Sequence, residues 1–315
     1  MIPRSLLFVP AVRPDWIVKA IAVKPDGVII DVEDSVPPHE KPSARARVRG
    51  MIAELHAANV QAFVRINGLS DGGFDDLSFV VDEHLSGIVV PKTRTAEEIT
   101  GLADRLSYAE GCRAVPHGAT KIIPLPETAP GIRDAHAIVE ASPRCIGLFG
   151  AMSGPIVGDI AEAVNISPSE RGEEQFYYAS RIVLDTLAAG RQLAIAAITG
   201  TRLDDHALVR TLVQRAKRFG FTTAALIHPS HVALAHAAFV PDDAAFEQAA
   251  GLIVAMAEAE ASGQGAVRFE GKMVDYAMLP RARLIVDEVV RRKPEMIKRL
   301  PAHPSLEAWR TRESP

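Results

Sequence analysis

Cysteine is nearly absent from this 315-residue chain, which contains only Cys112 and Cys145 and no C-x-x-C motif. Two isolated cysteines argue against a disulfide framework and against a thiolate zinc site, so we expect a protein of the reducing cytoplasm. Long apolar runs are also missing. No stretch of about 18 apolar residues could cross a membrane, and the apolar segment near the N-terminus is too short for a secretory signal.

A strong charge of either sign is missing as well. The net charge is −4 and the sequence pI is about 6.2, which indicates no nucleic acid or other polyanionic partner. Two phosphate-binding motifs are absent: no G-x-G-x-x-G follows the first apolar run, and no Walker A motif occurs. These absences count against a nucleotide-binding fold.

What the chain does contain is a series of short apolar runs, each about the length of a strand. Most are unbroken rather than alternating, which is typical of strands that are covered on both faces in a parallel sheet. Segments with helical spacing separate them. The runs cover residues 5–10, 27–31, 62–66, 87–92, 121–125, 145–150, 193–198 and 223–228.

This alternation predicts an α/β protein with a (β/α)₈ TIM barrel, because eight strand–helix units fall within about 230 residues. A doubly wound open sheet shows the same alternation and stays the alternative. Beyond the last run, two helical segments flank a Gly-rich extended segment, and a polar tail follows. We therefore predict a catalytic barrel domain over residues 1–235 and a C-terminal helical extension, lid and tail over residues 236–315.

Polar side chains follow the predicted strands at the points where these end. Catalytic groups of barrels collect at the carboxyl ends of the strands, so we expect these side chains to lie close together. One such residue is usually a helix cap or a solvated loop residue, but many strand ends with mixed charge favour a site. The residues are Asp31, Glu33, Asp34, Arg65, Asn67, Lys92, Glu127, Asp159 and His228.

This set suits the chemistry of a small acid with an oxygen beside its carboxylate. Glu127 and Asp159 follow adjacent strands, and Mg²⁺ is usually held by one or two carboxylates with waters and substrate completing the shell. Arg65 offers a two-pronged donor that matches a carboxylate. A metal that polarises the oxygen and an arginine that neutralises the acid would together make cleavage of the neighbouring C–C bond feasible.

Seven motifs, in order along residues 3–290, carry a resemblance to a known family. They are "RSLLFVPAVRPDWIVKA", "GVIIDVEDSVPPHEKPSAR", "FVRING", "VVPKTRTAEEI", "PLPETAPGI", "IHPSHV" and "GAVRFEGKMVD". As a set they resemble the citrate lyase beta-subunit-like and malyl-CoA lyase group of the HpcH/HpaI aldolase family. The resemblance implies a Mg²⁺-dependent carbon–carbon lyase that converts a 3-hydroxyacyl-CoA thioester to an acetyl-CoA-like thioester and a 2-oxo acid.

The resemblance also implies roles for particular residues. Glu127 of "ETAPG" is a metal ligand, and Arg65 of "VRIN" grips the substrate carboxylate. Glu33 and Asp34 of "DVED" border the metal site, where they could hold metal-bound waters.

Three further roles follow from the same motifs. Asp275 of "GKMVD" acts as the acid/base on the acetyl carbon and reaches a neighbouring subunit's site, in a homotrimer or hexamer. Arg4 and Lys92 are basic partners for oxygens of CoA or substrate. Each of these residues also has a purely structural interpretation, such as a helix cap for Asp275 or an ion pair of Arg65 with Asp31.

One departure from the family concerns the second metal ligand. The family shows F-G-x-x-D-L after the sixth strand, and a direct alignment places Ser153 in the Asp position. The segment that follows matches the family if about six residues are inserted, and the ligand is then Asp159. We predict Asp159.

Two other functions stay open. A CoA-independent aldolase acting on a pyruvate-derived enolate would favour a histidine beside the acid of the second strand, whereas His39 lies five residues past Asp34. A non-catalytic barrel that lost its metal is supported only by the insertion after the sixth strand.

Overall fold

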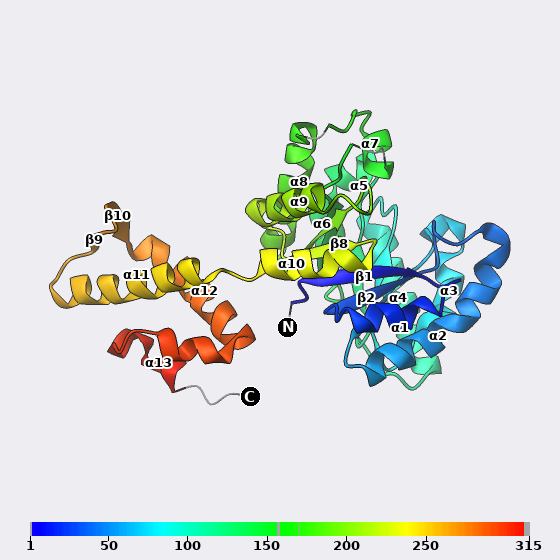
Figure 1. Cartoon of the computed structure of the whole chain (residues 1–315). Helices are drawn as coiled ribbons and strands as arrows, with labels where there is room; N and C mark the ends of the chain where they lie inside the picture. The colour runs from blue at the N-terminus through cyan, green and yellow to red at the C-terminus, as the bar shows by residue number, and fades with distance from the viewer. Residues whose placement is uncertain (1, 156–157, 170, 312–315) are drawn as a thin grey trace. The chain divides into compact units, whose positions relative to one another are not determined.

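The structure is a computed structural model that describes residues 2–155, 158–169 and 171–311 (Figure 1). The chain divides into two compact units, Met1–Phe239 and Val240–Pro315. The division falls at the end of α10 (Val232–Phe239) rather than at residues 235/236, because this helix packs on β1, β8 and α9 of the first unit.

The first unit is a parallel barrel of eight strands. The strands pair in the order β5-β4-β3-β2-β1-β8-β7-β6, and a parallel bridge between Ile122 and Cys145 brings the two end strands together. The predicted (β/α)₈ barrel is therefore confirmed. The strands are β1 (Ser5–Pro10), β2 (Gly27–Asp31), β3 (Gln61–Arg65), β4 (Leu85–Val90), β5 (Lys121–Pro124), β6 (Gly147–Ala151), β7 (Leu193–Ile198) and β8 (Thr223–Leu226).

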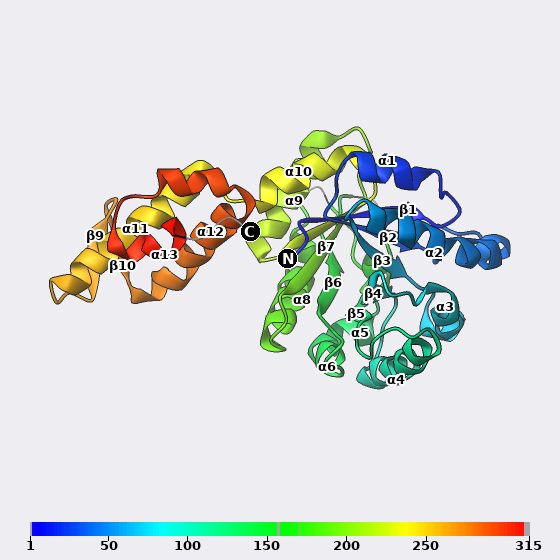
Figure 2. The same cartoon turned by 90° about the horizontal axis from the view of Figure 1, so that it is seen from below.

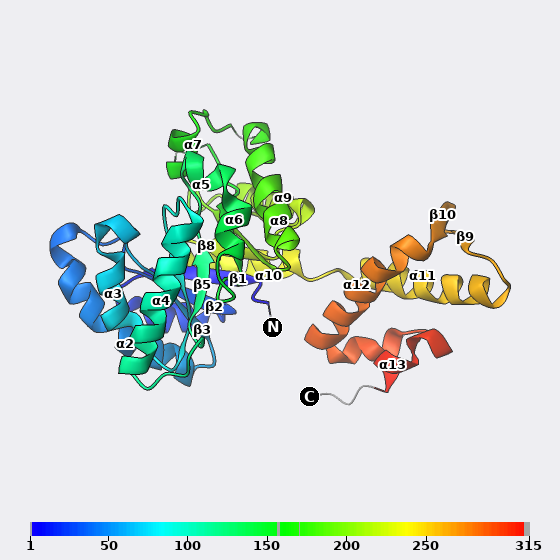
Figure 3. The same ribbon diagram turned by 180° about the vertical axis from the view of Figure 1, so that it is seen from behind.

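Helices surround the strands, as Figure 2 shows, and neighbours along the chain contact one another around the barrel from α1 to α4 and from α6 to α10. Figure 3 shows the same ring from behind. In the described residues no helix is long and apolar enough to cross a bilayer. The helices before α10 are α1 (Trp16–Ala22), α2 (Lys41–Ala57), α3 (Gly73–Val80), α4 (Ala96–Cys112), α5 (Ala129–Arg133), α6 (Ala135–Glu140), α7 (Asp159–Ala163), α8 (Phe176–Ala188) and α9 (His206–Phe219).

The strands are apolar on both faces because both faces are buried. In β2, Val28 and Ile30 belong to the cluster that includes the outer helices, whereas Ile29 belongs to the cluster that fills the barrel interior. Side chains alternate along a strand, so Asp31 takes the next interior position at the carboxyl end of β2. Arg65 takes the same position at the end of β3 and is the register partner of Asp31. The barrel thus turns a charged pair inward at its rim.

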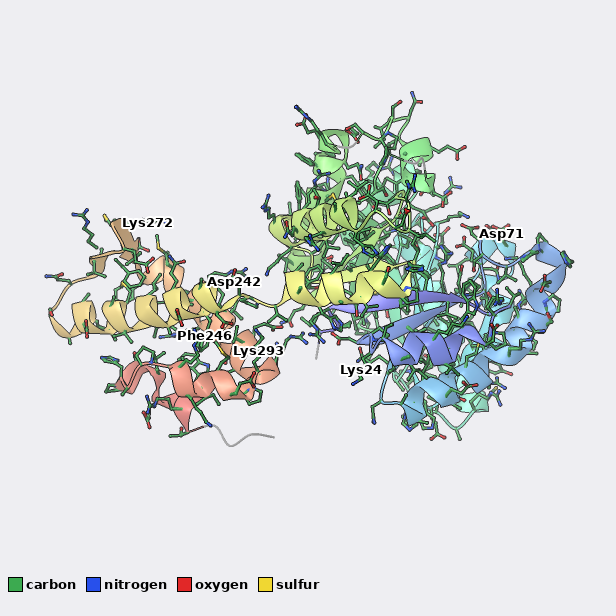
Figure 4. All side chains as sticks on the ribbon, viewed as in Figure 1. Lys24, Asp71, Asp242, Phe246, Lys272 and Lys293 are labelled. Atoms are coloured by element: carbon green, nitrogen blue, oxygen red, sulfur yellow. The ribbon has the colours of Figure 1, made fainter. Side chains whose placement is uncertain are left out.

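The second unit has its own core. Its helices are α11 (Asp243–Ala261), α12 (Leu279–Arg292) and α13 (Glu307–Arg310), and its hairpin consists of β9 (Ala266–Phe269) and β10 (Lys272–Asp275). Asp242 caps α11, and Phe246 lies on the side of that helix that faces α12 and α13 (Figure 4). Phe246 packs with Val286 and Leu306, so this unit buries apolar surface independently of the barrel.

Candidate functional site

The inward pair at the rim of the barrel is a close, two-pronged ion pair. The Arg65 guanidinium donates from Nε to Asp31 Oδ1 at 2.7 Å and from Nη2 to Oδ2 at 2.6 Å, and its Nη1 lies 3.0 Å from Glu33 Oε2. Burial alone would raise the pKa of Asp31, but the hydrogen bonds from Arg65 and Ser35 hold it below its usual value. The structural ion pair weighed as an alternative for Arg65 is therefore present. A role of Arg65 toward substrate remains a prediction.

Lys92 connects the acids of β2 to Glu127. Its backbone N–H donates to Glu127 Oε1 at 3.1 Å, while its Nζ donates to Glu33 Oε1 at 2.9 Å and lies 3.4 Å from Asp34 Oδ1. Lys92 has a φ of +53°, in the left-handed region that side chains other than glycine rarely adopt. This conformation costs on the order of 1 kcal/mol, and here it directs the amide and the ammonium of one residue at two different carboxylates.

Glu127 is the most perturbed acid of the site. It follows β5 directly, and the next residue, Thr128, caps α5 by accepting the Gly131 N–H at 3.1 Å. Gly131 must be a glycine, because a Cβ there would lie 2.1 Å from the carbonyl oxygen of Thr93. This tight turn buries the Glu127 side chain, which is only 7% exposed. Burial, together with the charges of Asp159 and Glu33, raises the pKa of Glu127 to about 8.

Asp159 shares a cavity of about 350 Å³ with Glu127 and Arg65. It is the first residue of α7, and its charge acts on both Glu127 and Lys92. Ser153, the other candidate for the second ligand, also lines the cavity, but its hydroxyl pairs with Thr199 Oγ1 at 3.3 Å. The structure therefore places Asp159 beside Glu127 despite the inserted residues. Its role as a metal ligand stays a prediction.

Two predicted residues lie elsewhere. Arg4 precedes β1, at the amino end of the barrel, where its guanidinium binds Asp26 at 2.7 and 2.9 Å. The prediction that Arg4 contacts CoA or substrate is wrong for this rim, because Arg4 and the rim residues lie at opposite ends of the strands. Asp275 belongs to the second unit, where its carboxylate accepts the Ala277 N–H at 3.0 Å and caps a short 3₁₀ helix.

The remaining polar residues have structural partners. Asn67 is buried and hydrogen-bonds to Asp76 and Lys41. His228 caps the 3₁₀ turn at Pro229–His231, and its Nδ1 lies 2.8 Å from Ser230 Oγ. His39, the histidine relevant to a CoA-independent aldolase, has a side chain that is 81% exposed and lies 3.8 Å from Glu40.

Three residues of the site were missed in the sequence. Lys41 donates to the backbone carbonyls of Val32 and Glu33 at 3.2 and 3.1 Å, which fixes the acidic loop after β2. The Gln175 side chain accepts the Ser153 N–H at 2.9 Å and donates to the Ser153 carbonyl at 3.0 Å. Tyr178 also lines the cavity. The lysine within "HEKPSAR" was a usable signal for Lys41, but no local pattern marks the other two.

Glu127 should make the stability of the metal-free protein depend on pH. The folded state keeps the Glu127 proton up to pH about 8, whereas the unfolded chain releases it near pH 4.5, so stability should fall as the pH rises between these values. Glu127→Gln removes this titration. Denaturant unfolding with a chelator present should find the variant equal to the wild type at about pH 5 and more stable by about 2–4 kcal/mol at about pH 9. The exposed Glu54→Gln is the control, and equal pH slopes for all three proteins would contradict the prediction.

An acidic site at the carboxyl rim of a closed parallel barrel defines the chain as a (β/α)₈ barrel enzyme of the type whose chemistry lies at that rim. Residues 4–229 match the HpcH/HpaI aldolase/citrate lyase family, and the chain belongs to that family. The predicted family is thereby confirmed. The family's description places the chain among the carbon–carbon lyases, as predicted.

The relatives cover most of the chain. It is 34% identical over 296 residues to a citrate lyase subunit beta-like protein of Deinococcus radiodurans, covering 90% of this chain and 96% of the relative. It is 28% identical to the mitochondrial citramalyl-CoA lyase of Rattus norvegicus, covering 90% and 85%. Among solved structures, CitE of Mycobacterium tuberculosis in complex with magnesium, acetoacetate and coenzyme A superposes with a TM-score of 0.69 at 28% identity, covering 90% and 97%.

Proposed function

We propose that this protein is a Mg²⁺-dependent lyase that cleaves, or forms, a 3-hydroxyacyl-CoA thioester of the malyl, citramalyl or citryl type. The products of cleavage are an acetyl-CoA-like thioester and a 2-oxo acid. The observation that carries the proposal is the position of Glu127, a buried carboxylate that faces the charge of Asp159 across one cavity. Two such carboxylates repel each other, and a divalent cation between them would remove the repulsion.

The donor set fits magnesium. Among the described residues no group of three or more His, Cys, Asp or Glu side chains could hold a metal by itself. Glu127 and Asp159 would hold Mg²⁺ as a pair, with water and substrate completing its shell, as is usual for this ion. When bound, Mg²⁺ would polarise the oxygen beside the scissile bond. The complex of the Mycobacterium tuberculosis relative with magnesium and coenzyme A supports this assignment.

The chain's own residues supply the remaining steps. Arg65, fixed by Asp31, would direct its remaining N–H bonds at the carboxylate of the acid half, and Lys92 would hold Glu33 and Asp34 where they can bind waters. In the cleavage direction the substrate hydroxyl loses its proton and the C–C bond breaks. The electron pair then passes to the thioester α-carbon, which takes a proton from Asp275.

We propose that Asp275 comes from a neighbouring copy in a homotrimer or hexamer, with the second unit as the extension that carries it. Its location in a separately packed unit is compatible with this, because Asp275 ends β10 and its carboxylate makes a local cap there.

A panel of malyl-, citramalyl-, methylmalyl- and citryl-CoA thioesters, assayed with and without Mg²⁺ by mass spectrometry, tests the proposal. We expect at least one thioester to yield a 2-oxo acid and a shorter thioester only when Mg²⁺ is present. Cleavage of free 2-oxo acid aldols without CoA would favour the CoA-independent aldolase. Failure to bind Mg²⁺, even with glyoxylate or oxaloacetate present, would favour a non-catalytic barrel.

A further inference from the structure

Tyr178 carries a buried hydroxyl that faces the cavity without a hydrogen-bond partner. The residue lies in the first turn of α8, a helix that packs on β6, and it is only 5% exposed. Within the described residues its Oη makes no hydrogen bond. A buried hydroxyl without a partner lowers folding stability, so its retention here suggests a partner that the protein itself does not supply.

The surroundings of the hydroxyl explain why it points into the site. A Cβ on Gly150 would lie 3.1 Å from Tyr178 Oη and 3.1 Å from Ile182 Cγ1, so the glycine leaves the room that the phenol occupies. The neighbouring cavity walls contributed by Leu125 and Phe149 are apolar and offer no acceptor.

The hydroxyl keeps its proton and so acts as a donor. Burial and, after it, the charge of Glu127 raise the pKa of Tyr178 well above its usual value. The Ala151 amide favours the ionised form slightly, but it makes no hydrogen bond of ordinary geometry with the hydroxyl. The influence of Glu127 also shows that the phenol is close to the carboxylate proposed as a metal ligand.

We propose that the Tyr178 hydroxyl donates a hydrogen bond to an oxygen of the bound 2-oxo acid and so helps to select that half of the substrate. The assignment rests on the proposed function, since it requires the 2-oxo acid to occupy the cavity shared by Glu127, Asp159 and Arg65. Tyr178 is then a substrate-contacting residue from a helix, whereas the other predicted contacts come from the ends of strands.

The test is isothermal calorimetry with pyruvate as the probe, in the presence of Mg²⁺, on the wild type, Tyr178→Phe and Tyr177→Phe. Tyr177 is the neighbouring residue on the same helix and is 72% exposed, which makes it a matched control. We expect Tyr178→Phe to weaken pyruvate binding about fivefold to tenfold, the usual effect of one lost hydrogen bond. Its affinity for Mg²⁺ alone should be unchanged, and Tyr177→Phe should match the wild type in both titrations.

Two readouts separate a substrate contact from a structural role. Without ligand, Tyr178→Phe should melt about 2 °C higher than the wild type, because the variant no longer buries an unsatisfied hydroxyl. In turnover of the thioester that the panel identifies, assayed in the condensing direction, the KM for the 2-oxo acid should rise while kcat stays within about twofold, as expected of a contact made equally in ground and transition states.

Each other outcome overturns the inference. If the wild type binds pyruvate and Tyr178→Phe binds it equally well, the hydroxyl does not contact the acid, and the proposed function stands. If Tyr178→Phe loses affinity for Mg²⁺ alone, the hydroxyl serves Glu127 instead. If the wild type fails to bind pyruvate with Mg²⁺, the proposed function and this inference both fail.

Discussion

Glu127→Ala is expected to abolish thioester cleavage, with a loss of roughly 10³-fold or more. Glu127 is the buried member of the carboxylate pair, and its side chain lies against the Lys92 amide and the charge of Asp159. Removing it would remove a metal ligand, and a metal that polarises the reacting oxygen contributes several kcal/mol of transition-state stabilisation. The measurement is the turnover rate at saturating Mg²⁺, alongside Mg²⁺ affinity by calorimetry.

The same measurement decides between the two candidates for the second ligand. Asp159→Ala should match Glu127→Ala in lost Mg²⁺ affinity, whereas Ser153→Ala should keep it, because the Ser153 hydroxyl already pairs with Thr199. Glu54→Ala, on the exposed face of α2, is the control for a lost carboxylate. An active, Mg²⁺-dependent Glu127→Ala enzyme would rule out the assignment of the metal ligand.

Asp275→Asn is expected to lower kcat by about 10²–10⁴-fold, the usual contribution of a general acid or base, while binding of the 2-oxo acid is unchanged. Asparagine suits this test because it caps helices as well as aspartate does, so the hydrogen bond to Ala277 is kept. A stability comparison by thermal unfolding should show little difference between the variant and the wild type. If Asp275→Asn retains full activity, Asp275 is only a cap.

Mixing two inactive variants tests whether Asp275 acts between copies. Glu127→Ala and Asp275→Asn chains, unfolded and refolded together, should regain part of the activity, because some sites would combine Glu127 of one copy with Asp275 of the other. Each variant refolded alone is the control. No recovery in a mixed oligomer would indicate that Asp275 serves the site of its own chain.

The barrel could be predicted because its strands are buried on both faces. All eight apolar runs became strands, with ends that moved by no more than about two residues. The largest differences arise at β4, which begins at Leu85 and ends before Lys92. Lys92 instead adopts a left-handed turn, which residue type does not reveal.

The rim residues could be predicted from one rule, that chemistry lies at the carboxyl ends of the strands, and the same rule explains the error. Asp31, Arg65 and Glu127 follow their strands and lie together, whereas Arg4 precedes its strand and lies at the other end. Tyr178 could not be predicted, because on an amphipathic helix a residue that faces a cavity has the same spacing as a residue of the core.

The clamp between Gln175 and Ser153 has a consequence for how this enzyme could evolve. Its two hydrogen bonds fix both ends of the segment between these residues, which contributes Asp159, Ile160 and Ile166 to the cavity wall. Doubling the length of such a loop costs only about 0.6 kcal/mol of closure entropy. Insertions here can therefore reshape the wall around the substrate while the strands and Glu127 keep their places, and a change of substrate would not require the barrel to change.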